Sequence, residues 1–191
     1  MTGLIELFTD PQIIKRIQDK LPKLFSIADL ESQRAGRVGM EVGSLRERII
    51  VSLLIYKFGE INVDTEIPIT EPEIDVRLFN KPISIKTKTG SGFAGVKLIW
   101  TVDAQNSKEF LSKYIPSYDM IYVQINWENK GCLYYFPVDI QREVFEYIGR
   151  ETYSLTIIDY NKGSFKIEIN WIKEELKFNS FKRWVDLWAQ D

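Results

Sequence analysis

One carboxylate and one amine on neighbouring predicted strands are the groups in this chain best suited to chemistry. Asp75 lies in the run EIDVRLF, and Lys86 follows it in PISIKTK. Both runs alternate apolar, often β-branched residues with polar ones, which predicts two β-strands. A tight hairpin would place Asp75 and Lys86 on the same side of the sheet, a few ångströms apart. A carboxylate beside an ammonium can hold a divalent metal ion and a phosphate group together.

The same alternation assigns the neighbouring side chains to faces. On the first strand, Asp75 shares its face with Arg77 and Phe79, opposite Ile74, Val76 and Leu78. On the second strand, Ser84 and Lys86 lie opposite Ile83 and Ile85. The residues Asn80-Lys81-Pro82 predict the turn, because Pro82 is compatible only with the start of the second strand. An ordinary cross-strand ion pair between Asp75 and Lys86 is the alternative interpretation.

A helix before the hairpin offers a second carboxylate. Residues 44–59 carry apolar side chains at helical spacing and end at Gly59, which predicts a helix packed against the sheet. Its predicted apolar stripe comprises Leu45, Ile49, Leu53 and Tyr56, widened by Ile50 and Leu54. Glu47 has two interpretations: it forms a capping box with Ser44, or it completes a metal site with Asp75. Glu41, just before this helix, is the alternative carboxylate.

The motif Glu73-Ile74-Asp75 … Ser84-Ile85-Lys86 resembles that of the PD-(D/E)xK nuclease superfamily. In that superfamily an acidic residue on one strand is followed by x-Ile-Lys on the next. The resemblance covers residues 35–127 and implies an α/β (α+β) fold, with a mixed β-sheet core flanked by helices. The chain departs from the pattern at Ser84, where the family usually has Asp or Glu. Some restriction enzymes of the superfamily have a neutral polar residue there and use a helix carboxylate instead.

The resemblance also implies roles for these residues in phosphodiester hydrolysis. Asp75 and Glu47 would bind Mg²⁺, with the backbone carbonyl of Ile85 as a further ligand. Lys86 would orient the attacking water and offset charge on the phosphate. Ser84 would hold a water molecule at the metal rather than the metal itself. Mg²⁺ suits the composition, because the chain has no histidine and a single cysteine, which leaves oxygen ligands.

Composition limits the classes of protein that the chain can belong to. Its 191 residues suit one globular domain spanning residues 1–191, and 45% hydrophobic content argues against disorder. No apolar run is long enough to span a membrane, and residues 1–12 do not resemble a signal peptide. The single Cys132 excludes an intrachain disulfide, so we expect a cytoplasmic protein. The net charge of −2 argues mildly against a sequence-independent DNA-coating protein, but a nuclease needs only a locally positive cleft.

Two segments carry candidate DNA-binding residues. Residues 31–43 contain three glycines and predict a loop, from which Arg34 and Arg37 would reach phosphates or base edges. Met40 in this loop either fills the core or wedges between base steps. Beyond the second strand, small polar groups and a lysine suit phosphate contacts or belong to an ordinary glycine loop. These residues are Lys88, Thr89 and Ser91.

The remaining segments predict the rest of the fold. Asp10 and Pro11 have the types preferred at the N-cap and first position of a helix. Other predicted strands are 60–70, 96–102, 119–127 and 132–138, with a hairpin of 152–158 and 164–171. Another helix is predicted to begin at Ser107, and two more are predicted over 139–147 and 173–189.

Within the superfamily, we expect a type II restriction endonuclease that acts on double-stranded DNA. Residues 35–127 would form the catalytic core, and residues 1–34 and 150–191 the dimerisation and DNA-recognition elements. The motifs GSLRERI, EIDVRL and ISIKTKTG are more specifically similar to the ThaI-like enzymes, which cut CGCG. A palindromic site calls for a homodimer, and a DNA methyltransferase would be its functional partner. The alternatives are a junction-resolving or DNA-repair nuclease and a non-catalytic interaction module.

Overall fold

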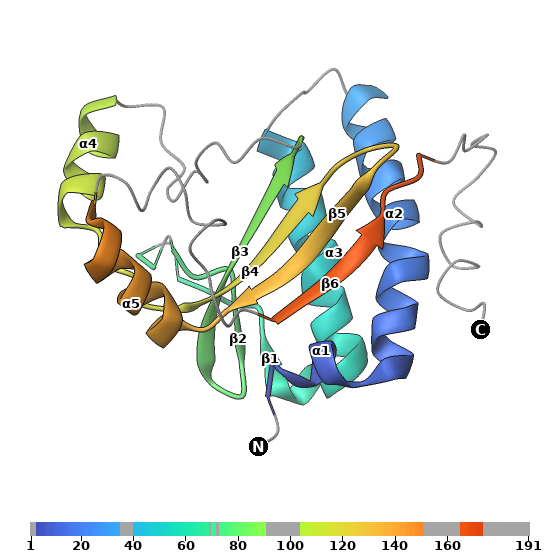
Figure 1. Ribbon diagram of the computed structural model, residues 1–191, viewed down its shortest axis with the longest axis horizontal. Coiled ribbons are helices and arrows are strands. Elements are labelled where there is room, and N and C mark those ends of the chain that lie inside the picture. The colour runs from blue at the N-terminus through green and yellow to red at the C-terminus, as the bar shows by residue number, and fades with distance from the viewer. Residues whose placement is uncertain are drawn as a thin grey trace.

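A computed structural model describes residues 3–34, 40–68, 70–71, 73–90, 104–150 and 165–173 of the chain. Its centre is one mixed sheet of six strands in the order β1-β2-β3-β4-β5-β6 (Figure 1). The strands are β1 (Val63–Asp64), β2 (Val76–Leu78), β3 (Lys81–Thr89), β4 (Asp119–Ile125), β5 (Lys130–Phe136) and β6 (Phe165–Asn170). The predicted fold class, a mixed sheet flanked by helices, is confirmed.

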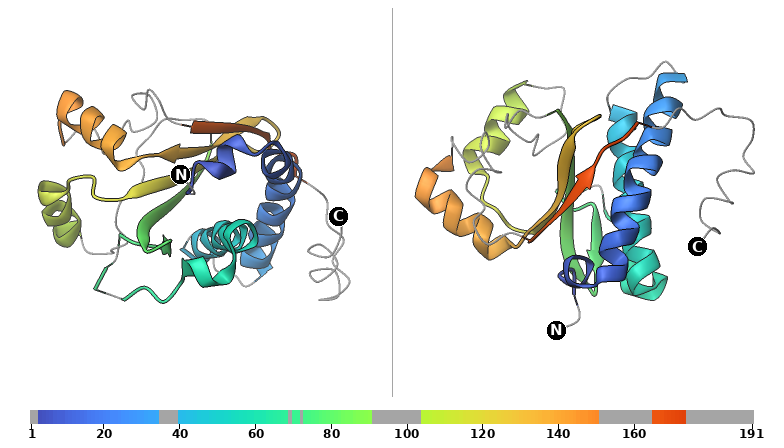
Figure 2. Two further views of the ribbon diagram at one scale, coloured as in Figure 1. Left: turned by 90° about the horizontal axis from the view of Figure 1, so that it is seen from below. Right: turned by 45° about the vertical axis from the view of Figure 1, so that its right-hand side comes forward.

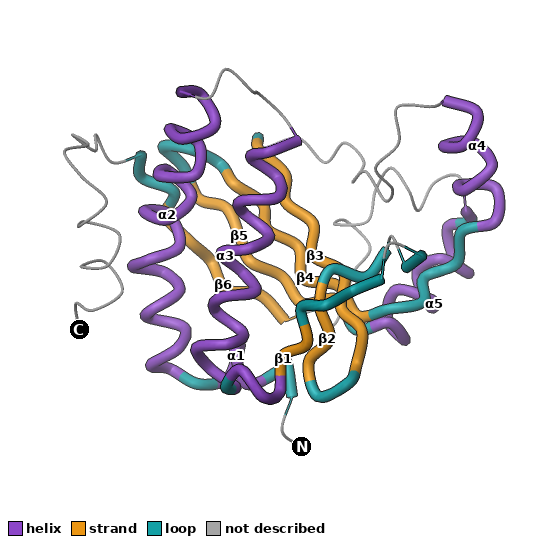
Figure 3. The backbone as a smooth tube through the Cα atoms, turned by 180° about the vertical axis from the view of Figure 1, so that it is seen from behind, coloured by secondary structure: helices purple, strands orange, loops and turns teal. Residues whose placement is uncertain are grey.

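Helices cover both faces of this sheet. On one face lie α1 (Glu6–Thr9), α2 (Pro11–Arg34) and α3 (Met40–Phe58), and on the other α4 (Ala104–Lys113) and α5 (Val138–Ile148) (Figure 2). A 3₁₀ turn over Glu60–Asn62 leads from α3 into β1. Seen from behind, α2 and α3 run side by side across the strands (Figure 3). None of the described helices is both long enough and apolar enough to cross a membrane.

The strand register decides which side chains reach which helices. β3 and β4 are parallel, with Lys86 opposite Tyr122, and all the other neighbours are antiparallel. Successive side chains along a strand point to opposite faces. Ser84 and Lys86 therefore share a face with Tyr122, toward α4 and α5, whereas Ile83 and Ile85 point toward α1 to α3.

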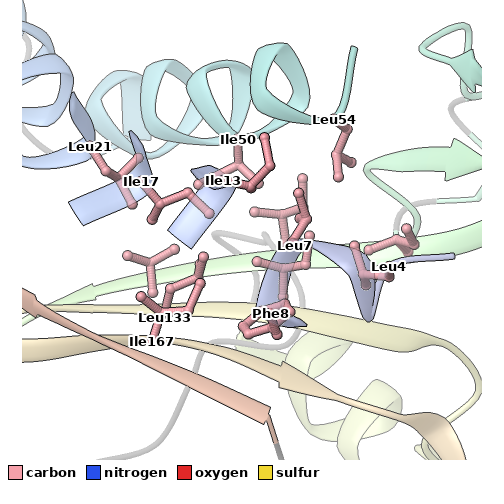
Figure 4. Packing of buried hydrophobic residues seen from close by; sticks show 14 of the residues in the cluster. Leu4, Leu7, Phe8, Ile13, Ile17, Leu21, Ile50, Leu54, Leu133 and Ile167 are labelled. Atoms are coloured by element: carbon pink, nitrogen blue, oxygen red, sulfur yellow. The ribbon is translucent and has the colours of Figure 1, made fainter. Parts of the chain in front are cut away.

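The larger hydrophobic core lies between the sheet and α1 to α3. Leucine, isoleucine and phenylalanine side chains from the helices meet those of β5 and β6 there (Figure 4). A smaller cluster on the other face is built from Tyr114, Met120, Tyr122, Phe136 and Val144. Asp10 caps α2 by accepting hydrogen bonds from the backbone N–H groups of Gln12 and Ile13. This cap agrees with the sequence prediction.

The turn between β2 and β3 lies earlier than the sequence indicates. Leu78 pairs with Lys81, so Phe79 and Asn80 form a two-residue turn with φ of 50° and 63°. Positive φ at both central residues is the geometry that follows the twist of an antiparallel pair. The prediction of Asn80-Lys81-Pro82 as the turn was wrong, because Pro82 pairs with Arg77 inside the ladder.

Both ends of segment 31–43, which the sequence predicts as a loop, are helical in the described residues. α2 continues to Arg34 and α3 begins at Met40. Ser44 is therefore inside α3, so the capping-box interpretation of Glu47 is wrong. The predicted apolar stripe of α3 also differs, because Tyr56 is 51% exposed while Ile50 and Leu54 are fully buried. The stripe that faces the sheet contains these two residues and the buried Arg46.

The other predicted helices and strands agree with the structure to different extents. β4, β5 and α5 lie where the sequence placed them, and α4 begins just before the predicted Ser107. The predicted strand 60–70 is reduced to Val63–Asp64, since the 3₁₀ turn occupies its beginning. The strand predicted at 96–102, the first strand of the later hairpin and most of the helix at 173–189 lie outside the described residues.

The burial contrast between Ile50 in the middle of α3 and Ile61 in the following 3₁₀ turn gives a stability test. Ile50 is fully buried in the larger core, whereas Ile61 is 96% exposed. We expect Ile50→Ala to lower the free energy of unfolding by about 2–5 kcal/mol, because it leaves a cavity. Ile61→Ala is the matched control and should change it by less than about 0.5 kcal/mol. Chemical denaturation measures both, and equal losses would contradict this packing.

Candidate active site

The predicted carboxylate and amine meet at the edge of β3. β2 begins at Val76, so its ladder with β3 ends at the pair of Val76 and Ile83. The backbone N–H of Asp75 still donates to the carbonyl of Ile83. Beyond this bond, β3 no longer has β2 as a neighbour, and the Asp75 side chain occupies the edge that β2 has left.

Three donors converge on one oxygen of Asp75. Its Oδ2 atom accepts hydrogen bonds from the backbone N–H of Ile85 at 2.6 Å, from Ser84 Oγ at 3.3 Å and from Lys86 Nζ at 3.3 Å. The ion pair is well covered, with the Lys86 side chain 9% and the Asp75 side chain 19% exposed. The predicted approach of Asp75 and Lys86 is therefore confirmed. None of these three bonds uses the Oδ1 atom, and among the described residues this atom accepts no other hydrogen bond.

The backbone carbonyl of Ile85 points toward the same edge. In a strand, the N–H and C=O of one residue point to the same side. The N–H of Ile85 reaches Asp75, so its carbonyl also faces this edge and away from β4. A carboxylate oxygen and a carbonyl oxygen thus face the same edge, and oxygen atoms of these types are the ligands that Mg²⁺ prefers.

Glu47 brings a second negative charge from α3. Burial, and to a smaller extent the negative charge of Asp75, raise the pKa of Glu47 to about 7, against the opposing effect of Lys86. The positive charge of Lys86 therefore has to offset two carboxyl groups. A divalent cation bound between Asp75 and Glu47 would remove the repulsion between them. Over the described ranges, no three Asp, Glu, His or Cys side chains are arranged to hold a metal by themselves. A metal here would accordingly need the main-chain oxygen as well as Asp75 and Glu47, and those groups fit it.

Glu73 is a residue of the site that sequence reasoning did not assign. Its pKa is raised by burial, and the charge of Lys86 opposes this shift. It lines a hollow of about 560 Å³ between the hairpin and α4, together with Lys113 and Tyr114. The charge of Glu73 adds to burial in raising the pKa of the Tyr114 hydroxyl. Its position two residues before Asp75 was the available signal, because alternate strand residues share a face.

Four of the six predicted DNA-binding residues lie in described elements near one end of the sheet. Lys88 and Thr89 belong to β3 itself rather than to a glycine loop, so that interpretation was wrong for them. Arg34 ends α2 and Met40 begins α3, and the side chains of these two and of Glu41 lie outside what the structure describes. Arg37 and Ser91 are also outside the described residues. The ends of α2, α3 and β3 lie together in Figure 1.

Comparisons with known proteins give two findings. A family model described as "Restriction endonuclease ThaI" matches residues 7–157. Among solved structures, the chain is similar to one described as "Restriction endonuclease in complex with substrate DNA", with 50% sequence identity and a TM-score of 0.85. That similarity covers 97% of this chain and 98% of the other. A comparison with curated proteins gives no match.

Burial of Glu47, together with its repulsion by Asp75, predicts that the ionised side chain lowers the stability of the metal-free protein. Its folded pKa of about 7 exceeds the ordinary value of 4.5, so the penalty is absent below pH 4.5 and complete above pH 7. Glu47→Gln should therefore stabilise the metal-free protein at pH 8, on the order of 1–2 kcal/mol after allowing for solvent screening. At pH 4.5 or below it should have little effect.

Denaturant unfolding with a chelator present measures this difference. The matched control is Glu146→Gln, an exposed position on α5, which should change stability by less than about 0.5 kcal/mol at both pH values. If Glu47→Gln were destabilising at pH 8, the raised pKa of Glu47 would be contradicted.

Proposed function

The chain belongs to the ThaI restriction endonuclease family, and on that premise we propose that it hydrolyses phosphodiester bonds of double-stranded DNA with Mg²⁺ as a type II restriction endonuclease. The proposed catalytic side chains are Asp75, Lys86, Glu47 and Ser84. The observation that carries the proposal is the convergence of Ile85 N–H, Ser84 and Lys86 on the Asp75 carboxylate at the open edge of β3.

Asp75, Glu47 and the backbone carbonyl of Ile85 would hold the metal ion. When bound, Mg²⁺ supplies Lewis-acid polarisation of a phosphate oxygen and lowers the pKa of a bound water. The raised pKa of Glu47 supports this ligand set, since it indicates a carboxyl group without full charge compensation. The hydroxyl of Ser84 replaces the carboxylate that most of the superfamily has at this position, and it would orient a water molecule.

Lys86 would act on the phosphate and on the attacking water. Its ammonium carries three protons, of which one is directed to Asp75 Oδ2. The other two can donate to a phosphate oxygen and to the water, which orients the nucleophile and offsets the charge that develops on the phosphate. The low exposure of Lys86 strengthens these interactions, because water screens the charge less.

The contacts to DNA would come from the end of the sheet beyond Lys86. Lys88 lies two residues further along β3, on the same face as Lys86, and would contact a phosphate. Thr89 and Ser91 would add neutral donors there, and Arg34 and Arg37 would contact phosphates or base edges. Met40 would insert between base steps. The assignment is supported by the position of Arg34, Met40, Lys88 and Thr89 at or near the ends of α2, α3 and β3.

Family membership favours the restriction endonuclease over the two other candidate functions. A junction-resolving or repair nuclease would cut branched DNA in preference to a linear duplex at one sequence. A non-catalytic module would leave plasmid DNA intact with Mg²⁺ present. A DNA methyltransferase that protects the same sequence is the proposed functional partner, and a cytoplasmic location follows from the proposed task of cutting incoming DNA.

The first experiment tests the catalytic pair. Lys86→Ala and Asp75→Asn should each lower the rate of Mg²⁺-dependent plasmid cleavage by about 100- to 1,000-fold, because each removes charge at the reacting phosphate. Binding to duplex DNA should survive, as measured by a gel shift with Ca²⁺ in place of Mg²⁺. Lys130→Ala removes an exposed lysine that pairs with Glu168, and it is the matched control. Cleavage at the normal rate by both site variants would reject the assignment.

A second experiment tests the proposed homodimer. Two strands of a palindromic site require two active centres related by a two-fold axis. We expect the protein bound to its DNA to have a mass that corresponds to two chains, measured by light scattering on size-exclusion fractions. Supercoiled plasmid should be converted mainly to linear DNA in one binding event. A single chain per duplex, with nicked circles accumulating, would contradict the dimer.

A further inference from the structure

A buried arginine next to Glu47 connects three elements of the fold. Arg46 of α3 is 7% exposed. Its Nη2 atom donates to Asp29 Oδ1 of α2 at 2.7 Å, and its Nη1 atom donates to Thr89 Oγ1 of β3 at 3.0 Å. The guanidinium also lies 5.8 Å from the ring centroid of Phe25. One planar group thus fixes α3 to α2 on one side and to the end of β3 on the other.

Stability alone does not explain this arrangement. A buried ion pair gains little over apolar side chains of similar volume, because both ions lose their hydration. The stripe of α3 that faces the sheet is otherwise apolar, with Ile50 and Leu54 following Arg46. A guanidinium at this position adds direction, since its donors are held in a rigid fork. That fork determines how α3 is rotated about its own axis relative to β3.

The rotation of α3 matters because Glu47 is the next residue. Successive residues of a helix are separated by about 100° around its axis, so a small roll of α3 displaces the Glu47 carboxylate. Thr89, the other end of the connection, lies three residues beyond Lys86 on β3. Arg46 therefore connects the helix that carries Glu47 to the strand that carries Ile85 and Lys86.

We propose that Arg46 is a positioning residue that holds Glu47 against Asp75 for cation binding, through its bonds to Asp29 and Thr89. The proposal rests on the function proposed above, in which Glu47 is a cation ligand. Residues that orient metal ligands typically change metal affinity about 10- to 100-fold when they are replaced. Arg46 should act in this range without touching the cation itself.

The fold supplies a matched control on the same pair of helices. Lys57 near the end of α3 pairs with Asp10 at the start of α2, with 2.7 Å between Nζ and Oδ2. This ion pair also joins α2 to α3, but it lies about 15 Å along the helix axis from Glu47. Lys57→Met should therefore lower the stability of the helix pair while leaving cation affinity unchanged.

The experiment measures Mn²⁺ uptake by the full chain, with free Mn²⁺ followed by electron paramagnetic resonance, and unfolding on the same samples. We expect Arg46→Met and Glu47→Gln each to weaken Mn²⁺ affinity about tenfold or more. Adding Arg46→Met to Glu47→Gln should weaken it no further, because Arg46 acts through Glu47. Arg46→Lys and Thr89→Val remove only the bond to Thr89, so each should give a smaller loss in the same direction.

The outcomes separate two kinds of failure. If Glu47→Gln binds Mn²⁺ as the natural protein does, the proposed ligand set is wrong, and the role of Arg46 falls with it. If Glu47→Gln weakens binding but Arg46→Met does not, or if the two losses add, only the positioning role is rejected. If Arg46→Met does not fold, Arg46→Lys and Thr89→Val decide in its place. Unchanged Mn²⁺ affinity in both variants would then overturn the proposal.

Discussion

The open edge of β3 at Ile85 is the constraint on which the site depends. A backbone N–H that is removed from water must find a partner, and the strand that would supply one, β2, begins its ladder only at Val76. The Asp75 carboxylate takes that role at 2.6 Å. The side chain is thereby fixed by the main chain rather than by another flexible side chain. Because Ile85 also turns its carbonyl to this edge, the structural bond that completes the strand also directs the two oxygen ligands of the proposed metal site toward one edge.

The electrostatics of the site follow from this placement. Lys86 and Ser84 point to the face opposite Ile85, and both still reach Asp75 because its carboxylate lies at the edge between the two faces. Glu47 approaches from the helix layer that packs on the Ile85 face. The lysine offsets one carboxyl group while a second stays close, so the charge of Asp75 adds to burial in raising the pKa of Glu47. The uncompensated charge lowers the stability of the free protein and favours a cation.

The sequence predicted this site where the signal was local. Alternation with period two placed Asp75 beside Lys86, and the Asp10-Pro11 pair marked the start of α2. The hairpin turn was misplaced because its position depends on the pairing of Leu78 with Lys81, and a proline adjacent to the turn gave the stronger local signal. The start of α3 was misplaced because Gly39 and Gly43 suggested a loop, and a Ser-x-x-Glu pattern inside the helix resembled a cap.

Other parts of the site depend on contacts between distant segments, which periodicity cannot report. α3 packs against both α2 and the sheet, so its apolar residues form two faces, and the more conspicuous one is only partly buried. Arg46 is identified only through its partners Asp29 and Thr89, which are far from it in the sequence. A charged residue four positions before Ile50, on the face that the sheet covers, was the one available sign of a buried partner.

In the proposed metal site, the serine at position 84 makes the helix carboxylate necessary. Ser84 Oγ lies 3.3 Å from Asp75 Oδ2, so an acid at this position would place another carboxylate against Asp75 with a single lysine to offset them. A hydroxyl avoids that repulsion, but it removes one anionic ligand from the strand. The charge that a divalent cation needs must then come from α3, through Glu47. Since α3 is a separate element, its rotation relative to β3 becomes part of the site, and a rigid connection at Arg46 gains a function that a strand carboxylate would not have required.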